Sequence, residues 1–99
     1  MTPNLFSFFH QKILDLHETF SQRISQGRRV PAVVRRLIDE IFVSPVISNV
    51  LLGKRWDLPF NTVKGGILKL EKMGILTEVS GKRRNKLYAS KELLDILIK

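Results

Sequence analysis

Four cations stand within five residues in the run Lys82-Arg83-Arg84-Asn85-Lys86. Lysine and arginine side chains bind phosphate oxygens, and each phosphate that they neutralise releases counterions. Gly81 and Asn85 are turn residues, so we expect the run to form the tip of a hairpin. A cationic hairpin tip is typical of contact with a nucleic-acid backbone or minor groove. The same composition also fits a solvated loop that keeps the chain soluble.

The rest of the charge is placed unevenly. The 99 residues hold 17 Lys and Arg against 9 Asp and Glu, for a formal net charge of +8. Residues 59–90 hold seven bases and two acids, residues 27–58 hold six bases and three acids, and both ends of the chain are neutral. A chain this basic usually has an anionic partner, of which nucleic acid is the commonest; a membrane surface and an acidic protein are the alternatives.

A helix predicted over residues 59–73 comes before this hairpin, and Gly74 is placed to end it. At 100° per residue, Val63, Ile67 and Leu70 fall on one side with Phe60 and Gly66 beside them, which predicts the core face. The opposite side carries Asn61, Gly65, Leu68 and Lys72, flanked by Thr62, Lys69 and Lys64.

The polar face of this helix has the residue types that contact DNA. We expect Asn61 and Thr62 to reach base edges, and Lys64, Lys69 and Lys72 to reach phosphates. The backbone contacts fall to Lys82, Arg83, Arg84 and Lys86 at the hairpin tip. Gly65 and Leu68 offer no polar contact on the same face, which favours low sequence specificity.

Three further helices are expected around these groups. Residues 30–42 place Val34, Leu37, Ile38 and Ile41 on a buried face, and residues 48–56 place Val50 and Leu51 inward behind a Ser48 cap. Residues 46–47 form a short extended piece, residues 75–80 and 86–89 form the hairpin strands, and Ser90 caps a last helix.

This order predicts a mainly α chain with a small β-hairpin. The arrangement is that of a winged helix-turn-helix with an additional N-terminal helix and a C-terminal helix. We divide the chain into an N-terminal amphipathic helix over residues 1–27 and a winged-helix domain over residues 28–99.

The predicted N-terminal helix, residues 4–26, carries one apolar stripe. Its side chains are Phe6, Phe9, Ile13, Leu16, Phe20 and Ile24. The stripe either packs on the rest of the chain or forms a partner interface. For the second alternative we assign Phe6, Phe9, Ile13, Leu16 and Phe20 to the interface, together with Leu68.

No residue pattern predicts an enzyme, a metal site or a cofactor. The chain has no cysteine, and His10 and His17 have no third ligand at metal-binding spacing. No apolar run approaches the roughly 20 residues that cross a bilayer, and the N-terminus lacks the basic segment of a secretory signal. We therefore expect a cytoplasmic protein without a membrane contact.

Three segments together resemble the C-terminal tail of Fic-family proteins. They are residues 45–48 (PVIS), 73–81 (MGILTEVSG) and 84–88 (RNKLY). The tail of that family is a winged helix, so the resemblance implies the same fold. The chain departs from the family pattern at Asp57 and Pro59 in the helix-connecting turn, and at Gly65, where a basic residue is common.

The resemblance does not extend to the activity of the family. Fic enzymes transfer AMP to a protein hydroxyl through an H-P-F-x-x-G-N-G-R loop, and neither His10 nor His17 begins such a loop. Three hypotheses remain open. The chain is a DNA-binding module related to Fic tails, a protein-interaction module that dimerises or docks on a Fic-type partner, or the tail of a longer Fic protein.

Overall fold

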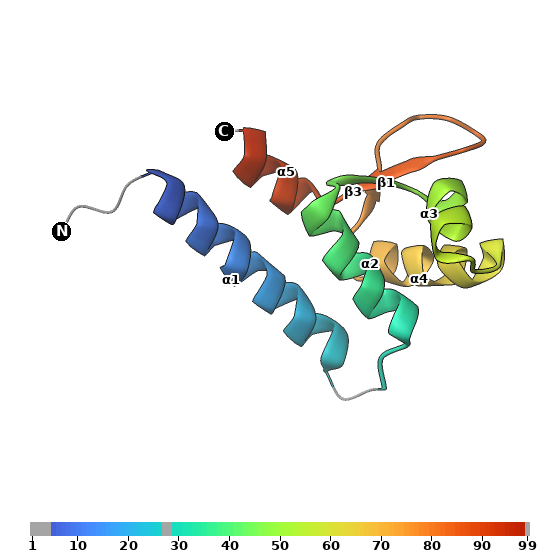
Figure 1. Cartoon of the computed structure of the whole chain (residues 1–99), viewed down its shortest axis with the longest axis horizontal. Coiled ribbons are helices and arrows are strands. Elements are labelled where there is room, and N and C mark those ends of the chain that lie inside the picture. Colours follow the sequence, from blue (N-terminus) through green and yellow to red (C-terminus); the bar gives the residue numbers. More distant parts are fainter. Residues whose placement is uncertain (1–4, 27–28, 99) are drawn as a thin grey trace.

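The computed structural model describes residues 5–26 and 29–98, with the backbone alone for residues 5 and 6. It is mainly helical with one small antiparallel sheet (Figure 1). The elements are α1 (Leu5–Ser25), α2 (Ala32–Val43), β1 (Val46–Ser48), α3 (Asn49–Trp56), α4 (Phe60–Lys72), β2 (Thr77–Glu78), β3 (Leu87–Ala89) and α5 (Lys91–Ile98). The predicted helices are confirmed, with ends that differ by a residue or two.

The sheet has three strands in the order β1-β3-β2. The predicted hairpin is confirmed, because β2 pairs antiparallel with β3. The extended piece β1 also joins the sheet, with Ile47 opposite Tyr88. The sequence predicted the extended piece but not its place in the sheet, because the pairing joins residues about 40 positions apart. The first hairpin strand is shorter than expected, because the N–H groups of Ile75 and Leu76 donate to the Leu70 carbonyl of α4.

Local side-chain chemistry sets the helix ends. The Leu51 N–H donates to Ser48 Oγ at 3.3 Å, and the Leu93 N–H donates to Ser90 Oγ at 3.2 Å. Both serine caps are as predicted. Gly74 follows α4 with φ +77°, as expected for the glycine after a helix.

One apolar core joins every helix to the sheet. Its buried members are Phe20, Ile24, Val34, Leu37, Ile38, Ile41, Ile47, Leu52, Val63, Ile67, Leu70, Ile75, Leu76, Tyr88 and Leu93. Helices α2 and α4 approach closely at Gly66, where a Cβ atom would lie 2.8 Å from Leu37 Cδ1. Gly66 therefore serves the packing of these two helices.

Helix α3 turns a different leucine inward than the one predicted. Leu52 is 4% exposed and Leu51 is 66% exposed, so the assignment of Leu51 to the core is wrong. Val50 is half-buried, and Trp56 packs against the core. The helix has only eight residues, which leaves its rotation to be set by tertiary packing.

The apolar stripe of α1 is divided between core and surface. Phe20 is 0% exposed and Leu16 packs on the core, so their assignment to a partner interface is wrong for Phe20 and restricted for Leu16. Phe9 and Ile13 are half-buried, and the side chain of Phe6 lies outside the described residues. The C-terminal half of α1 thus belongs to the fold of a single chain.

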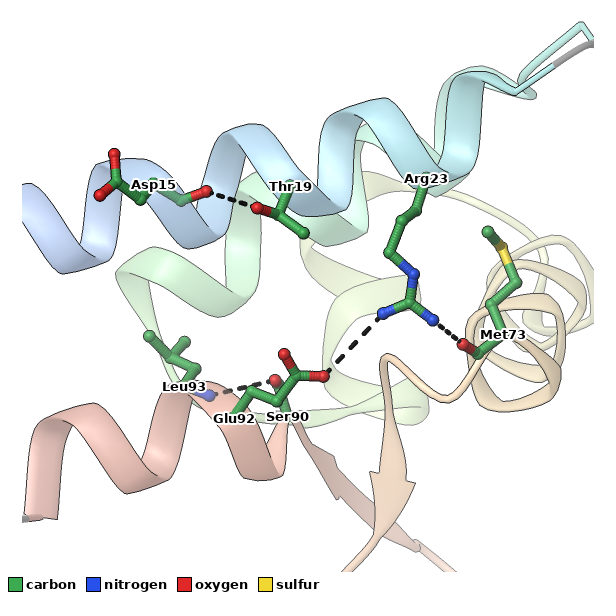
Figure 2. A network of polar contacts seen from close by, with 7 residues as sticks. All are labelled: Asp15, Thr19, Arg23, Met73, Ser90, Glu92 and Leu93. Carbon is green, nitrogen blue, oxygen red and sulfur yellow. Dashed lines mark hydrogen bonds and ion pairs between the residues drawn. The ribbon is translucent and has the colours of Figure 1, made fainter.

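Polar contacts of Arg23 join that half of α1 to two other helices. Figure 2 shows the Arg23 guanidinium between two other elements, where it donates to the Met73 carbonyl at the end of α4. Its other terminal nitrogen lies 3.9 Å from Glu92 Oε1 on α5. One arginine therefore ties three helices together at the edge of the core.

Candidate nucleic-acid interface

The loop between β2 and β3 carries the cationic run, and we call residues 82–86 the basic loop. It projects from the sheet on the side of the molecule away from α1 (Figure 1). Lys82, Arg83 and Arg84 are exposed, and Lys86 is half-buried. Gly81 and Asn85 have φ values of 67° and 52°, so the two predicted turn residues both adopt left-handed backbone conformations.

The Glu78 carboxylate organises the start of this loop. Its Oε2 accepts hydrogen bonds from the backbone N–H of Ser80, from the Ser80 hydroxyl at 2.9 Å and from the Gly81 N–H at 2.7 Å. Ser80 Oγ in turn accepts from the Leu87 N–H at 3.2 Å. The Gly81 and Ser80 hydrogen bonds, with a smaller contribution from the charge of Lys86, hold the pKa of Glu78 below its ordinary value of 4.5. The acid nearest the basic loop is therefore engaged with the loop backbone.

The outer face of α4 is largely as predicted. Asn61, Thr62, Lys69 and Lys72 are exposed, as are Gly65 and Leu68. Val63, Gly66, Ile67 and Leu70 are buried. Phe60 is an error in the predicted core face, because its side chain is 55% exposed. Phe60 is the first residue of α4. Because side chains of a helix lean toward its N-terminus, this ring extends beyond the start of the helix.

The side chain of Lys64 extends from α4 toward the sheet. Its Nζ donates to the Tyr88 hydroxyl at 3.1 Å and stands 5.7 Å from the centroid of the Tyr88 ring. Tyr88 is a buried residue of β3, so it gives Lys64 a fixed anchor. This contact directs a cation of α4 toward the basic loop.

Together these elements enclose a hollow of about 350 Å³, which we call the cationic hollow. It is lined by Asn49, Val50, Phe60, Lys64, Arg83, Arg84, Asn85, Lys86 and Tyr88. Four of these residues are cations, and none of the described lining residues is Asp or Glu. The predicted lysine of α4 and the predicted cations of the hairpin thus lie around one hollow.

Not every predicted contact residue lines the hollow. Lys82 lies outside its lining, as do Asn61 and Thr62. Lys69 and Lys72 are in the last turn of α4, away from Phe60 and Lys64 in its first half. All five of these residues are exposed, but none of them lines the hollow.

The sequence missed three residues of this region, Asn49, Phe60 and Tyr88. Asn49 is 5% exposed, and its Nδ2 and Oδ1 atoms have no hydrogen-bond partner within residues 5–26 and 29–98. No local pattern identifies it, because Asn49 follows the capping serine and reads as part of a helix start. Tyr88 and Lys64 are 24 positions apart, and their contact depends on the fold of the sheet.

Two cations of α2 and α3 interact with other residues of the chain. The Arg36 guanidinium carbon stands 4.3 Å from the centroid of the Trp56 ring, and Arg55 pairs with Glu40. Arg28 lies outside the described residues. The basic residues of this middle segment therefore contribute less to an anion-binding surface than their number indicates.

The histidines lie on α1, away from the hollow. His17 Nε2 is 2.7 Å from Asp39 Oδ1, and the His17 ring meets Phe42 edge to face. Across the described residues, no group of three or more His, Cys, Asp or Glu side chains is placed to hold a metal ion. No helix in the same ranges is both long and apolar enough to cross a membrane.

No protein-family model matches the chain. A search of the curated proteins also gives no match.

Proposed function

We propose that the chain is a winged-helix module that binds duplex DNA with low sequence specificity. In this proposal α3 and α4 are the helix pair, α4 is the recognition helix, and the basic loop is the wing. The element order and the pairing of β1, β3 and β2 support the assignment. It is also in keeping with the resemblance to Fic-family tails, and we propose no catalytic activity for the chain.

The observation that carries the proposal is the meeting of cations from two elements at the cationic hollow. Lys64 comes from α4, while Arg83, Arg84 and Lys86 come from the basic loop. Like charges repel at short range, and an anionic partner removes that cost. The phosphate backbone of DNA supplies a row of such charges.

The exposed face of α4 determines how much sequence such a module reads. Asn61 and Thr62 can hydrogen-bond base edges near the start of the helix. Gly65 and Leu68 give the middle of the face no polar group. Lys69 and Lys72 add phosphate contacts at the end, so most of the affinity is electrostatic.

Binding to a fluorescent duplex across a salt series tests the proposal. We expect the logarithm of the affinity to fall linearly with the logarithm of salt concentration, with a slope near −0.9 for each phosphate contacted. Two unrelated duplex sequences should bind within about tenfold of one another. No binding at low salt, or binding that salt does not weaken, would overturn the proposal.

A specific observation favours a second candidate, a protein interface formed by α1 and α5. Phe8, Phe9, Lys12, Asp95 and Ile96 line a hollow of about 240 Å³ between these helices. Leu97 and Ile98 expose apolar surface at the end of α5. A second copy of the chain or a Fic-type protein would cover this surface. Light scattering at several concentrations should then show a dimer, and a strict monomer would leave self-association without support.

A further inference from the structure

The cationic hollow adjoins a second, less polar hollow. This second hollow has a volume of about 260 Å³ and is lined by Asn49, Val50, Gly53, Lys54, Leu58 and Phe60. Asn49, Val50 and Phe60 belong to both linings. The second hollow is walled mainly by Val50, Leu58 and Phe60, so we call it the apolar hollow. A charged compartment and an apolar compartment thus lie side by side.

Phe60 stands at the boundary with much of its ring open to solvent. An exposed aromatic ring beside cations is the arrangement on which unpaired bases stack. Within a duplex each base is already stacked on its neighbours, so a phosphate contact alone gives this ring no role. An unpaired base offers this ring the flat face on which it can stack.

Asn49 lies at the same boundary and is nearly fully buried. Neither its Nδ2 donor nor its Oδ1 acceptor has a partner in the described part of the chain. Buried polar groups are almost always paired, and an amide is satisfied by a group that presents an acceptor next to a donor. The edge of adenine has this pattern, and asparagine pairs with it through two hydrogen bonds.

The charged compartment suits a phosphate group. Lys64 uses one of its three ammonium protons on the Tyr88 hydroxyl, which leaves two for a ligand. Arg84 and Lys86 line the same hollow from the basic loop. The first residues of α3 and α4 also face it, and the N-terminal end of a helix favours an anion.

We propose that the two hollows together bind a single unpaired nucleotide. The base lies against Phe60 in the apolar hollow with its edge toward Asn49, and the phosphate lies among Lys64, Arg84 and Lys86. The volumes of the hollows are of the order found for small-ligand sites, about 300–1,000 Å³. The nucleotide is either free or an unpaired nucleotide at the end of a DNA strand, and the chemistry of recognition is the same.

Calorimetric titration of the full chain with AMP and with ribose 5-phosphate tests base recognition without DNA. Both compounds carry the phosphate, and only AMP carries a base. We expect AMP to bind at least tenfold more tightly. Equal affinity for the two compounds, or no binding of AMP at millimolar concentration, would overturn the inference.

Two variants and one control locate the base. Phe60→Ala and Asn49→Leu should each remove most of the preference for AMP while leaving ribose 5-phosphate affinity within twofold. Leu68→Ala is the matched control, because Leu68 is another exposed apolar residue of α4 and lies outside both linings. An unchanged AMP preference in folded Phe60→Ala would contradict the placement of the base.

The source of the nucleotide is tested with two duplexes. One is blunt, and the other carries a single unpaired adenosine nucleotide at a 5′ end. Tighter binding of the second duplex that is lost in Phe60→Ala supports a strand end, while an effect of this variant on AMP alone supports a free nucleotide. An effect on neither contradicts the inference. Blunt-duplex affinity is measured separately, so failure of nucleotide binding and failure of duplex binding are distinguishable.

Discussion

The molecule has two sides on which charge is treated in different ways. Around α1, α2 and α5, several charged side chains pair with neighbours, as in the contacts of His17 with Asp39 and of Arg23 with Glu92. Around α4 and the basic loop, Lys64, Arg83, Arg84 and Lys86 line one hollow without an acid in its described lining. Some charges of the first side are paired within the chain, whereas the cations of the second side line one hollow without a paired acid among the described residues.

The two halves of α1 should show the largest difference in stability. Phe20 is fully buried, so Phe20→Ala should lower the free energy of unfolding by about 3–5 kcal/mol. Phe8 is 53% exposed, and Phe8→Ala should change it by about 0.5 kcal/mol or less. Urea denaturation of both variants measures the difference. A similar loss in both would mean that the N-terminal half of α1 also belongs to the core.

The charge of the basic loop should carry most of the duplex affinity. Replacing Lys82, Arg83, Arg84 and Lys86 with alanine should weaken binding by about 100-fold at low salt and reduce the salt slope by about three to four. A control variant removes the same charge from exposed residues elsewhere, namely Lys12, Arg29, Arg35 and Lys91. Equal losses in the two variants would show that net charge rather than the basic loop determines binding.

Two adjacent glycines of α4 should respond with opposite signs. A Cβ at Gly66 meets Leu37 and Val33, so Gly66→Ala should lower the free energy of unfolding by about 1–3 kcal/mol. A Cβ at Gly65 meets nothing within 4 Å, so Gly65→Ala should raise it by about 0.5–1 kcal/mol. Thermal unfolding followed by circular dichroism measures both. Stabilisation by Gly66→Ala would contradict the close packing of α2 on α4.

The smallest expected effect is the pH dependence of the basic loop. Because folding lowers the pKa of Glu78 below 4.5, its contribution to stability is present above the unfolded pKa and is lost as pH falls through the folded pKa. The Ser80 and Gly81 amide resonances should therefore shift below pH 4.5. Glu78→Gln should abolish that shift. An inflection at or above 4.5 in the unmodified chain would contradict the account of these hydrogen bonds.

The sequence predicted the helices and the hairpin because their signals are local. Ser48, Ser90 and Gly74 mark ends that depend on neighbouring backbone groups. It failed where the rotation of a helix about its axis, or pairing between distant strands, determines which residues are buried. Leu51 and Leu52 compete for the core in an eight-residue helix, and only packing selects Leu52.

The candidate interface was predicted in the same partial way. The cations were visible as a run and as a helix face, so Lys64 and the basic loop were identified. Their meeting at one hollow depends on Tyr88 and on the pairing of β1 with β3, which no local pattern encodes. Phe60 and Asn49 were missed because burial at the start of a helix is set by the element packed against it.

Mapping a bound duplex by NMR chemical-shift changes tests the central claim most directly. The account predicts that the largest changes fall on the backbone amides of residues 82–86 and of the first half of α4, while those of α1 and α5 change little. Changes concentrated on α1 and α5, or spread evenly over the chain, would contradict it.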